Sequence, residues 1–243
     1  MLTTKAWPLL FVILSSILVF SACQDRIFDN PFDPEASEAL FEVVNTILSP
    51  AAVPLGLAWD GNTLWSADGY TDILYSLNRV NGAVIRSLAS PQSLLSGVAF
   101  DGEDLWICSE AGATVFRVGI LTGGIQKRLD LQKGSFSALA FGGASLWIAD
   151  SLSNKILQVD HLTGEILFSF SNPGKRVDGI ASDGSTLWLS DATTLTIYQV
   201  SPQGSVIKTF LSPGQAPRGL AFDGVYLWNA DATGKIYQLR IQN

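Results

Sequence analysis

The sequence predicts an all-β fold, a five-bladed β-propeller with four-stranded blades, and three observations support this. First, the pair Leu-Trp occurs five times, starting at residues 64, 105, 146, 187 and 227, in steps of 41, 41, 41 and 40 residues. Second, a phrase similar to "GLAWDG" comes before each pair. Third, only short apolar runs separated by turn residues lie between the pairs. Four short strands in about every 40 residues are typical of a propeller blade.

Each unit has its strands in the same order. The "GLAF" strand ends at an Asp-Gly turn, the Leu-Trp strand follows, and a strand such as "ILQVD" leads through a Gly-containing turn to the fourth. The last unit stops one strand short, at "IYQLRIQN". The segment "FEVVNTIL" at 41–48 is the counterpart of "SVIKTFL" at 205–211. We therefore expect the N-terminal strand to complete the last blade, so that no sheet edge stays open at the seam.

Residues 1–22 have the features of a signal peptide. Lys5 precedes an apolar stretch too short for a comfortable membrane span, and "FSA" comes directly before Cys23. This predicts lipidation of Cys23, as in a bacterial lipoprotein, with an ordinary secretion signal or a short membrane anchor as the alternative. Residues 23–41, rich in acid and proline, are then a tether, and residues 42–243 form the propeller. We expect an extracytoplasmic, lipid-anchored protein of the bacterial cell envelope. The outer membrane is favoured because Gln24 is not the Asp of the inner-membrane sorting rule.

The composition limits the partners. The chain of 243 residues has a net charge of −7 and no run of Lys or Arg, which argues against nucleic acid or an anionic membrane surface as partner. We expect a monomer that contacts the membrane through its lipid alone and binds an envelope protein, a peptide or a glycan. If Cys23 carries lipid, Cys108 has no disulfide partner, and the run "LWIC" indicates a buried thiol.

The residues that recur in every unit are expected to be structural. The tryptophans of the Leu-Trp pairs do the same work five times, so we expect them to pack blade against blade rather than to bind a sugar or a peptide. The aspartates of the Asp-Gly turns are expected to cap their own hairpins. These are Asp60, Asp101, Asp183 and Asp223, and the third unit has Gly142 at this position.

A second set of acidic residues follows the Leu-Trp pairs: Asp68, Asp150, Asp191 and Asp231, with Ser109 and then Glu110 in the second unit. If the first strand runs down the channel, the second returns these residues to the upper mouth. Such a ring could hold Ca²⁺ or a cationic ligand. Alternatively, each carboxylate accepts backbone N–H bonds from its own loop, which we favour. The pattern predicts no other cofactor and no zinc site, because His161 has no partner at ligand spacing.

The residues just before the "GLAF" strands are expected to face the channel at the same mouth. They differ between units, and function often lies where a repeat departs from itself: Leu55, Ser96, Ser137, Asp178 and Arg218. Asp178 and Arg218 are on neighbouring units and oppositely charged. They are therefore either an ion pair or polar groups that bind a ligand. Tyr70 adds aromatic surface nearby.

The unit "DGSTLWLSDATTLTIYQVSPQGSVIKTF" resembles blades of secreted propellers, among them NHL-type repeat proteins and the five-bladed glutamine cyclotransferase family. Units of that family look like "GLATDGxxLYxSDGxxxIYxIDPxT", and the likeness covers nearly all of residues 43–243. It implies an acyltransferase that forms N-terminal pyroglutamate, with Glu110 or Asp178 as the acid/base carboxylate. The family's Gln, Glu or Trp before some "GL" strands is absent here, and Ser66 stands where it has Glu in an "EST" phrase. We therefore favour a binding or scaffold protein over an enzyme.

Overall fold

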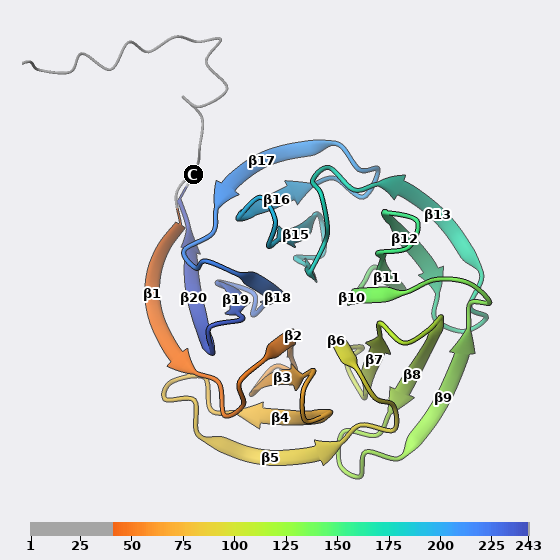
Figure 1. Cartoon of the computed structure of the whole chain (residues 1–243), viewed down its shortest axis with the longest axis horizontal. Coiled ribbons are helices and arrows are strands. Elements are labelled where there is room, and N and C mark those ends of the chain that lie inside the picture. The colour runs from red at the N-terminus through yellow and green to blue at the C-terminus, as the bar shows by residue number, and fades with distance from the viewer. Residues whose placement is uncertain (1–40, 243) are drawn as a thin grey trace, which may run out of the picture. The chain divides into compact units, whose positions relative to one another are not determined.

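The computed structural model describes residues 41–242, which form twenty β-strands and no helix. The strands form five antiparallel four-stranded sheets arranged as blades around a centre (Figure 1). No helix in this part of the chain could therefore span a membrane. The predicted five-bladed β-propeller is confirmed. From the centre outwards, blade one is β2 (Pro54–Trp59), β3 (Leu64–Asp68), β4 (Ile73–Leu77) and β5 (Val84–Ala89).

The next three blades repeat this order along the chain. Blade two is β6 (Leu95–Phe100), β7 (Leu105–Ser109), β8 (Thr114–Val118) and β9 (Ile125–Asp130). Blade three is β10 (Phe136–Gly142), β11 (Ser145–Asp150), β12 (Lys155–Asp160) and β13 (Ile166–Ser171). Blade four is β14 (Gly179–Ser182), β15 (Leu187–Asp191), β16 (Thr196–Val200) and β17 (Val206–Leu211).

Blade five joins the two ends of the described chain. It consists of β18 (Pro217–Phe222), β19 (Leu227–Asp231), β20 (Lys235–Ile241) and, as its outer strand, β1 (Phe41–Leu48). The pairing of β1 with β20 runs from Phe41 opposite Ile241 to Leu48 opposite Lys235. The ring of Phe41 stacks on that of Phe210 in blade four at a centroid distance of 4.4 Å. The predicted closure of the last blade by the N-terminal strand is confirmed.

The hydrophobic core is divided into five clusters, each between two adjacent blades. The five repeated tryptophans belong to these clusters and are at most 5% exposed, as predicted. In four blades the indole N–H also donates to the aspartate of the Asp-Gly turn, for example Trp188 Nε1 to Asp183 Oδ2 at 2.9 Å. The aspartate therefore caps its own hairpin, as predicted, and also supplies the acceptor that a buried indole requires.

The repeated glycine of the "GLAF" phrase allows the inner strands to meet closely. A Cβ at Gly56 would lie 2.7 Å from the backbone N of Val98 on the next blade. At Gly219 it would lie 2.6 Å from the backbone N of Leu57. Glycine in four of the blades therefore lets the inner strands approach closely, and the third blade accommodates Ala138 at the same position.

Candidate functional site

The end of the channel at which the inner strands begin is called the upper mouth here. Most inner strands have a bulge near their start, where one or two residues are not paired with the second strand of the blade. In blade one, for example, the omission lies between Pro54 and Gly56. A bulge turns a side chain out of the ordinary strand alternation. The omitted residues include four that the sequence predicts at this mouth: Leu55, Ser96, Ser137 and Arg218.

The two serines join blades and are not open to a ligand. Ser96 Oγ donates to the carbonyl of Phe136 at 2.5 Å, and Ser137 Oγ donates to that of Val177 at 2.6 Å. Each bond crosses to the next blade, and the serines are only 1% and 3% exposed. Contact of Ser96 and Ser137 with a ligand stays a prediction, and in this structure the bulge directs both hydroxyls into the blade interface.

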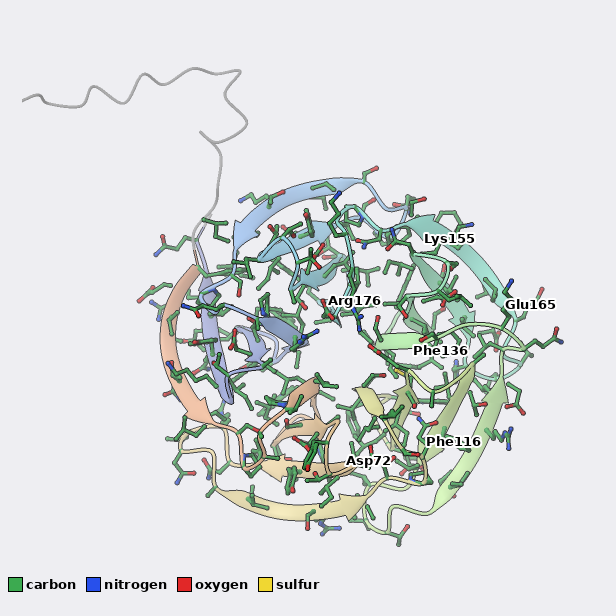
Figure 2. The ribbon with its side chains drawn as sticks, viewed as in Figure 1. Asp72, Phe116, Phe136, Lys155, Glu165 and Arg176 are labelled. Atoms are coloured by element: carbon green, nitrogen blue, oxygen red, sulfur yellow. The ribbon has the colours of Figure 1, made fainter. Side chains whose placement is uncertain are left out.

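Four charged side chains form a continuous chain of ion pairs at the upper mouth. Asp178 Oδ1 accepts from Arg218 Nη1 at 2.5 Å and from Arg176 Nε at 2.9 Å. The Nη2 group of Arg176 then donates to Glu110 Oε1. Arg176 lies in the loop before β14 and Glu110 directly follows β7, so the pair links blades four and two past blade three. Figure 2 shows Arg176 pointing toward the centre of the ring.

Both candidate catalytic carboxylates belong to this chain. The side chain of Asp178 is 3% exposed and also accepts the N–H of Ala192 at 3.1 Å. Glu110 is more accessible, but it is paired with Arg176. Both carboxylates therefore accept charge-assisted hydrogen bonds, Asp178 from two guanidinium groups and Glu110 from one. The pairing of Asp178 with Arg218 fulfils the ion-pair alternative of the sequence analysis.

The arginines keep donors that the ion pairs do not use. A guanidinium has five N–H donors. The Nε atom of Arg218 is buried and has no hydrogen-bond partner within residues 41–242. The side chains of Arg176 and Arg218 are 42% and 28% exposed. The upper mouth therefore presents partly exposed guanidinium groups that are fixed in place by a buried carboxylate.

The aspartates that end the second strands do not form an open acidic ring. Each accepts N–H bonds both from its own turn and from the loop that enters its blade. Asp68, for example, accepts from Thr71 N at 2.7 Å and from Val53 N at 2.9 Å. Burial acts to raise the pKa of Asp191, but N–H groups of both segments outweigh it and lower that pKa. The four are at most 6% exposed and accept N–H bonds as in the favoured alternative, while contact of any of them with a channel ligand stays a prediction: Asp68, Asp150, Asp191 and Asp231.

The metal prediction has no geometric support in the described residues. Within residues 41–242, no group of three or more His, Cys, Asp or Glu side chains could hold an ion. Binding of Ca²⁺ nevertheless stays an untested prediction.

The remaining candidates lie apart from the ion pairs. Tyr70 is 83% exposed in the turn after β3. Cys108 is completely buried, and burial raises the pKa of its thiol to about 12, so it is an inert core residue. Cys23, with its predicted lipid, lies outside the described residues.

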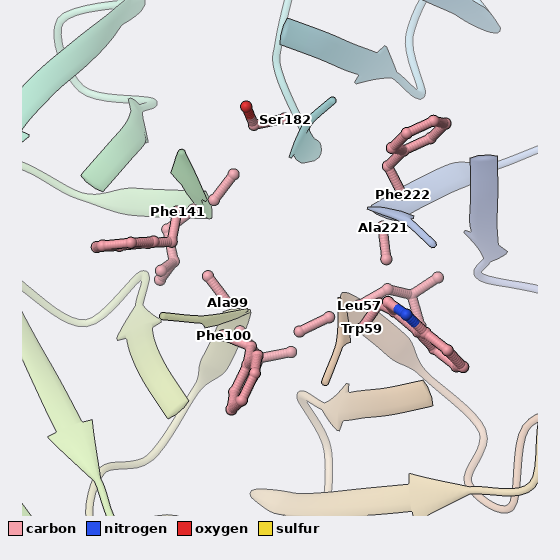
Figure 3. Close-up of a pocket in the computed structure, with 12 residues that line it drawn as sticks. Leu57, Trp59, Ala99, Phe100, Phe141, Ser182, Ala221 and Phe222 are labelled. Atoms are coloured by element: carbon pink, nitrogen blue, oxygen red, sulfur yellow. The ribbon is translucent and has the colours of Figure 1, made fainter. Parts of the chain in front are cut away.

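The side chains at the opposite end of the channel are mostly apolar and carry no charge. A cavity of about 70 Å³ lies where the inner strands end, and residues of all five blades line it. Figure 3 shows Ala99 and Ala221 at its edge, with the rings of Phe100 and Phe222 turned away from the centre. This cavity offers little room and no charged side chain. The upper mouth is therefore the better candidate for recognition.

Comparison with known proteins supports the fold and no particular activity. No protein-family model matches the chain, and no curated protein matches it. The structure is similar to that of Myxococcus xanthus glutaminyl cyclase, with a TM-score of 0.74 and 11% identity over 85% of this chain and 99% of that one. It is also similar to virginiamycin B lyase from Staphylococcus aureus, with a TM-score of 0.52 and 19% identity over 80% and 68%. A streptogramin B lyase matches with a TM-score of 0.51 and 16% identity over 83% and 98%.

The sequence analysis missed Arg176, the residue that joins the two acidic candidates. A signal was present, because Arg176 lies three residues before Gly179 in the loop that enters blade four. The same position in the other units is Val53, Leu94, Ser135 and Ala216. Arg176 is therefore the one charged residue at that position. A comparison of the entry loops, rather than of the strands alone, would have found it.

Proposed function

We propose that this chain is a binding protein of the bacterial cell envelope, held at the membrane by a lipid on Cys23. Its upper mouth binds a carboxylate-bearing peptide segment of another envelope protein. The signal-like residues 1–22 and the small residues before Cys23 support the anchor. The binding role rests on one observation, which is that arginines pair with both carboxylates that could have performed acid–base chemistry.

The chemistry of the mouth favours an acidic ligand. Arg176 and Arg218 are partly exposed, and each has more N–H donors than its ion pairs use. Guanidinium groups bind carboxylates through two parallel hydrogen bonds, which adds directional selectivity to the charge attraction. Asp178 holds both arginines in position before a ligand arrives, which lowers the entropy lost on binding.

An array of immobilised peptides with and without Asp and Glu tests this proposal on the full-length chain. We expect preferential binding to acidic peptides, and Arg176→Gln should weaken it about tenfold. Arg86→Gln on the outer strand β5 is the matched control and should bind like the wild type. The proposal fails if acidic peptides are not preferred, or if Arg176→Gln and Arg86→Gln behave alike.

The lipid anchor has a separate test. In a bacterial host supplied with radiolabelled palmitate, the wild type should incorporate label and fractionate with membranes. Cys23→Ser should do neither, and Cys108→Ser should behave like the wild type. Equal labelling of wild type and Cys23→Ser would contradict the anchor.

A second candidate function is a glutaminyl-cyclase-like acyl transfer. The observation in its favour is the TM-score of 0.74 to Myxococcus xanthus glutaminyl cyclase, with Glu110 and Asp178 as the available carboxylates at the mouth. Mass spectrometry of a peptide with N-terminal Gln decides between the two functions. Loss of ammonia with the wild type, and none with a heat-killed control, would replace binding by catalysis as the primary role.

A further inference from the structure

A hollow on the upper rim of blade two lies apart from the ion pairs of the mouth. Its volume is about 250 Å³, below the range of drug-sized sites and suited to one small ring. We call it the blade-two pocket. It lies between the loop from β5 to β6, the turn from β7 to β8 and the outer strands, and its main lining residues are Gln92, Ser109, Gly112, Phe116 and Arg128.

The same place is filled in blades four and five. Gly174, in the loop that enters blade four, lies against the carboxylate of Asp191 and the ring of Tyr198. A Cβ at Gly174 would lie 3.1 Å from Tyr198 Cε2 and would collide with Asp191 Oδ2. Gly214 is equally enclosed by Asp231 and the tyrosine at 237 in blade five. In these blades the loop, the aspartate and the tyrosine leave no space for a further group.

Blade two differs at all three of these positions. Gln92 replaces the loop glycine, Ser109 replaces the aspartate, and Phe116 replaces the tyrosine. The shorter Ser109 side chain donates to the carbonyl of Ser93 at 2.6 Å, whereas the aspartates of the other blades accept N–H groups from this loop. The peptide group between Ser93 and Leu94 therefore presents its carbonyl to Ser109, and Leu94 takes a φ of 56°, in the left-handed region that is uncommon for a residue other than glycine.

One polar group in the blade-two pocket lacks a partner. Gln92 Nε2 is buried, and no protein atom of residues 41–242 accepts a hydrogen bond from it. A buried donor without an acceptor has lost its hydrogen bonds to water without replacement, so such groups in native proteins call for an explanation. Backbone strain and an unpaired amide at the same place are features that cluster at binding sites.

The other walls define the chemistry that would satisfy this amide. Phe116 is half-buried and supplies an apolar surface, and the Arg128 guanidinium lies 5.8 Å from its ring centroid. Arg128 is neutralised by Asp130, at 2.9 Å. The site therefore has no net positive charge to attract an anion, and it combines a hydrogen-bond donor with an aromatic surface.

We propose that the blade-two pocket binds one neutral sugar ring. A sugar presents an apolar C–H face, which packs against the part of Phe116 that Arg128 leaves uncovered, and hydroxyl oxygens. One of these accepts a hydrogen bond from Gln92 Nε2 after the amide, which is covered by protein in this structure, turns toward the pocket. This site is separate from the arginine-lined mouth, and the inference does not depend on the proposed peptide binding.

Saturation-transfer NMR and calorimetry on the full-length chain test the proposal with glucose, galactose, mannose and N-acetylglucosamine as probes. We expect at least one sugar to bind with millimolar or tighter affinity. Gln92→Gly, which restores the residue of blades four and five, should weaken binding about tenfold. Phe116→Leu should do the same. Gln126→Ala on the opposite rim and Arg176→Gln at the mouth should leave it unchanged.

Three results would overturn the proposal. The first is that none of the four sugars binds, and the second is that Gln92→Gly binds as the wild type does. The third is displacement of the sugar by acetate, which would show that the pocket selects an acid. Gln92→Gly carries the test if Phe116→Leu does not fold, since glycine already occupies this position in two blades.

Discussion

The closure of the ring by β1 can be tested with two neighbouring residues of that strand. Ile47 is 3% exposed and belongs to the cluster between blades five and one, with Leu57 and Trp228. Leu48, the next residue, is 70% exposed. Each residue is changed to alanine, so each variant loses three carbon atoms, and the main difference between the two positions is their burial.

The expected cost follows from that burial. Three buried carbons contribute roughly 2.4 kcal/mol at about 0.8 kcal/mol each. The cavity that remains after partial relaxation adds about 1 kcal/mol. We therefore expect Ile47→Ala to lower the free energy of unfolding by about 3 kcal/mol and Leu48→Ala by about 0.5 kcal/mol or less. For a domain of this size the first change lowers Tm by about 6–12 °C.

Urea unfolding followed by tryptophan fluorescence measures both variants. An unchanged slope with a lower midpoint shows a loss of stability without a change in the exposed area. The reasoning is refuted if the two variants unfold at the same urea concentration. It is also refuted if Ile47→Ala unfolds like the wild type, because the buried side of β1 would then not hold the ring closed.

Four further predictions follow from the site and the core. Burial alone would raise the pKa values of Asp101 and Asp183, but hydrogen bonds, led by Arg117 for the first and the Thr186 hydroxyl for the second, hold both at about 2. Because the folded pKa is below the unfolded one, the stability that these carboxylates contribute is complete above about pH 4 and is lost as the pH falls toward 2. The urea midpoint of Asp183→Asn should therefore fall less over this pH range than that of the wild type. In the Cys23→Ser variant, Cys108 is the remaining cysteine and should not react with a thiol reagent at pH 8 until the protein is unfolded, and labelling of this variant in its native state would contradict the burial of Cys108. Asp178→Asn should cost about 1–3 kcal/mol of unfolding free energy, since two arginines lose the negative charge that they share, and an unchanged urea midpoint would argue against the ion pairs. Calcium added to metal-free protein should leave Tm unchanged, whereas a rise would revive the metal site.

The recurring features of this molecule were predictable because the residues that form each of them occur several times in the sequence. Five Leu-Trp pairs fix the number of blades, and the incomplete last unit locates β1. The role of a residue that occurs in one unit only cannot be predicted from repetition. Arg176 reaches Glu110 only because the ring brings blades two and four to one mouth, a relation between residues 66 positions apart that no local pattern contains.

The directions of the mouth residues were less predictable than their positions. Ser96 and Ser137 are at the expected end of the channel, but the bulges turn them into the blade interface. In a regular strand, successive side chains point to opposite faces. A bulge interrupts this alternation, and here the bulges lie where the inner strands crowd together. The blade-two pocket escaped notice for a related reason. Gln92 and Ser109 do not stand out in their own unit. They matter because they replace a glycine and an aspartate that contact each other in other blades.

The pairing of β1 with β20 also has a consequence for how the protein is made. Glu42 and Arg240 form an ion pair across these strands, although 198 positions separate them in the chain. During synthesis β1 leaves the ribosome before any other strand of the ring, and its only sheet partner leaves last. Four blades can assemble while the chain grows, but the fifth must wait for the final residues, with the edge of β1 unpaired meanwhile. Such distant pairing slows folding and exposes a strand to wrong partners. β1 therefore remains an unpaired edge strand from the time it is made until β20 follows it.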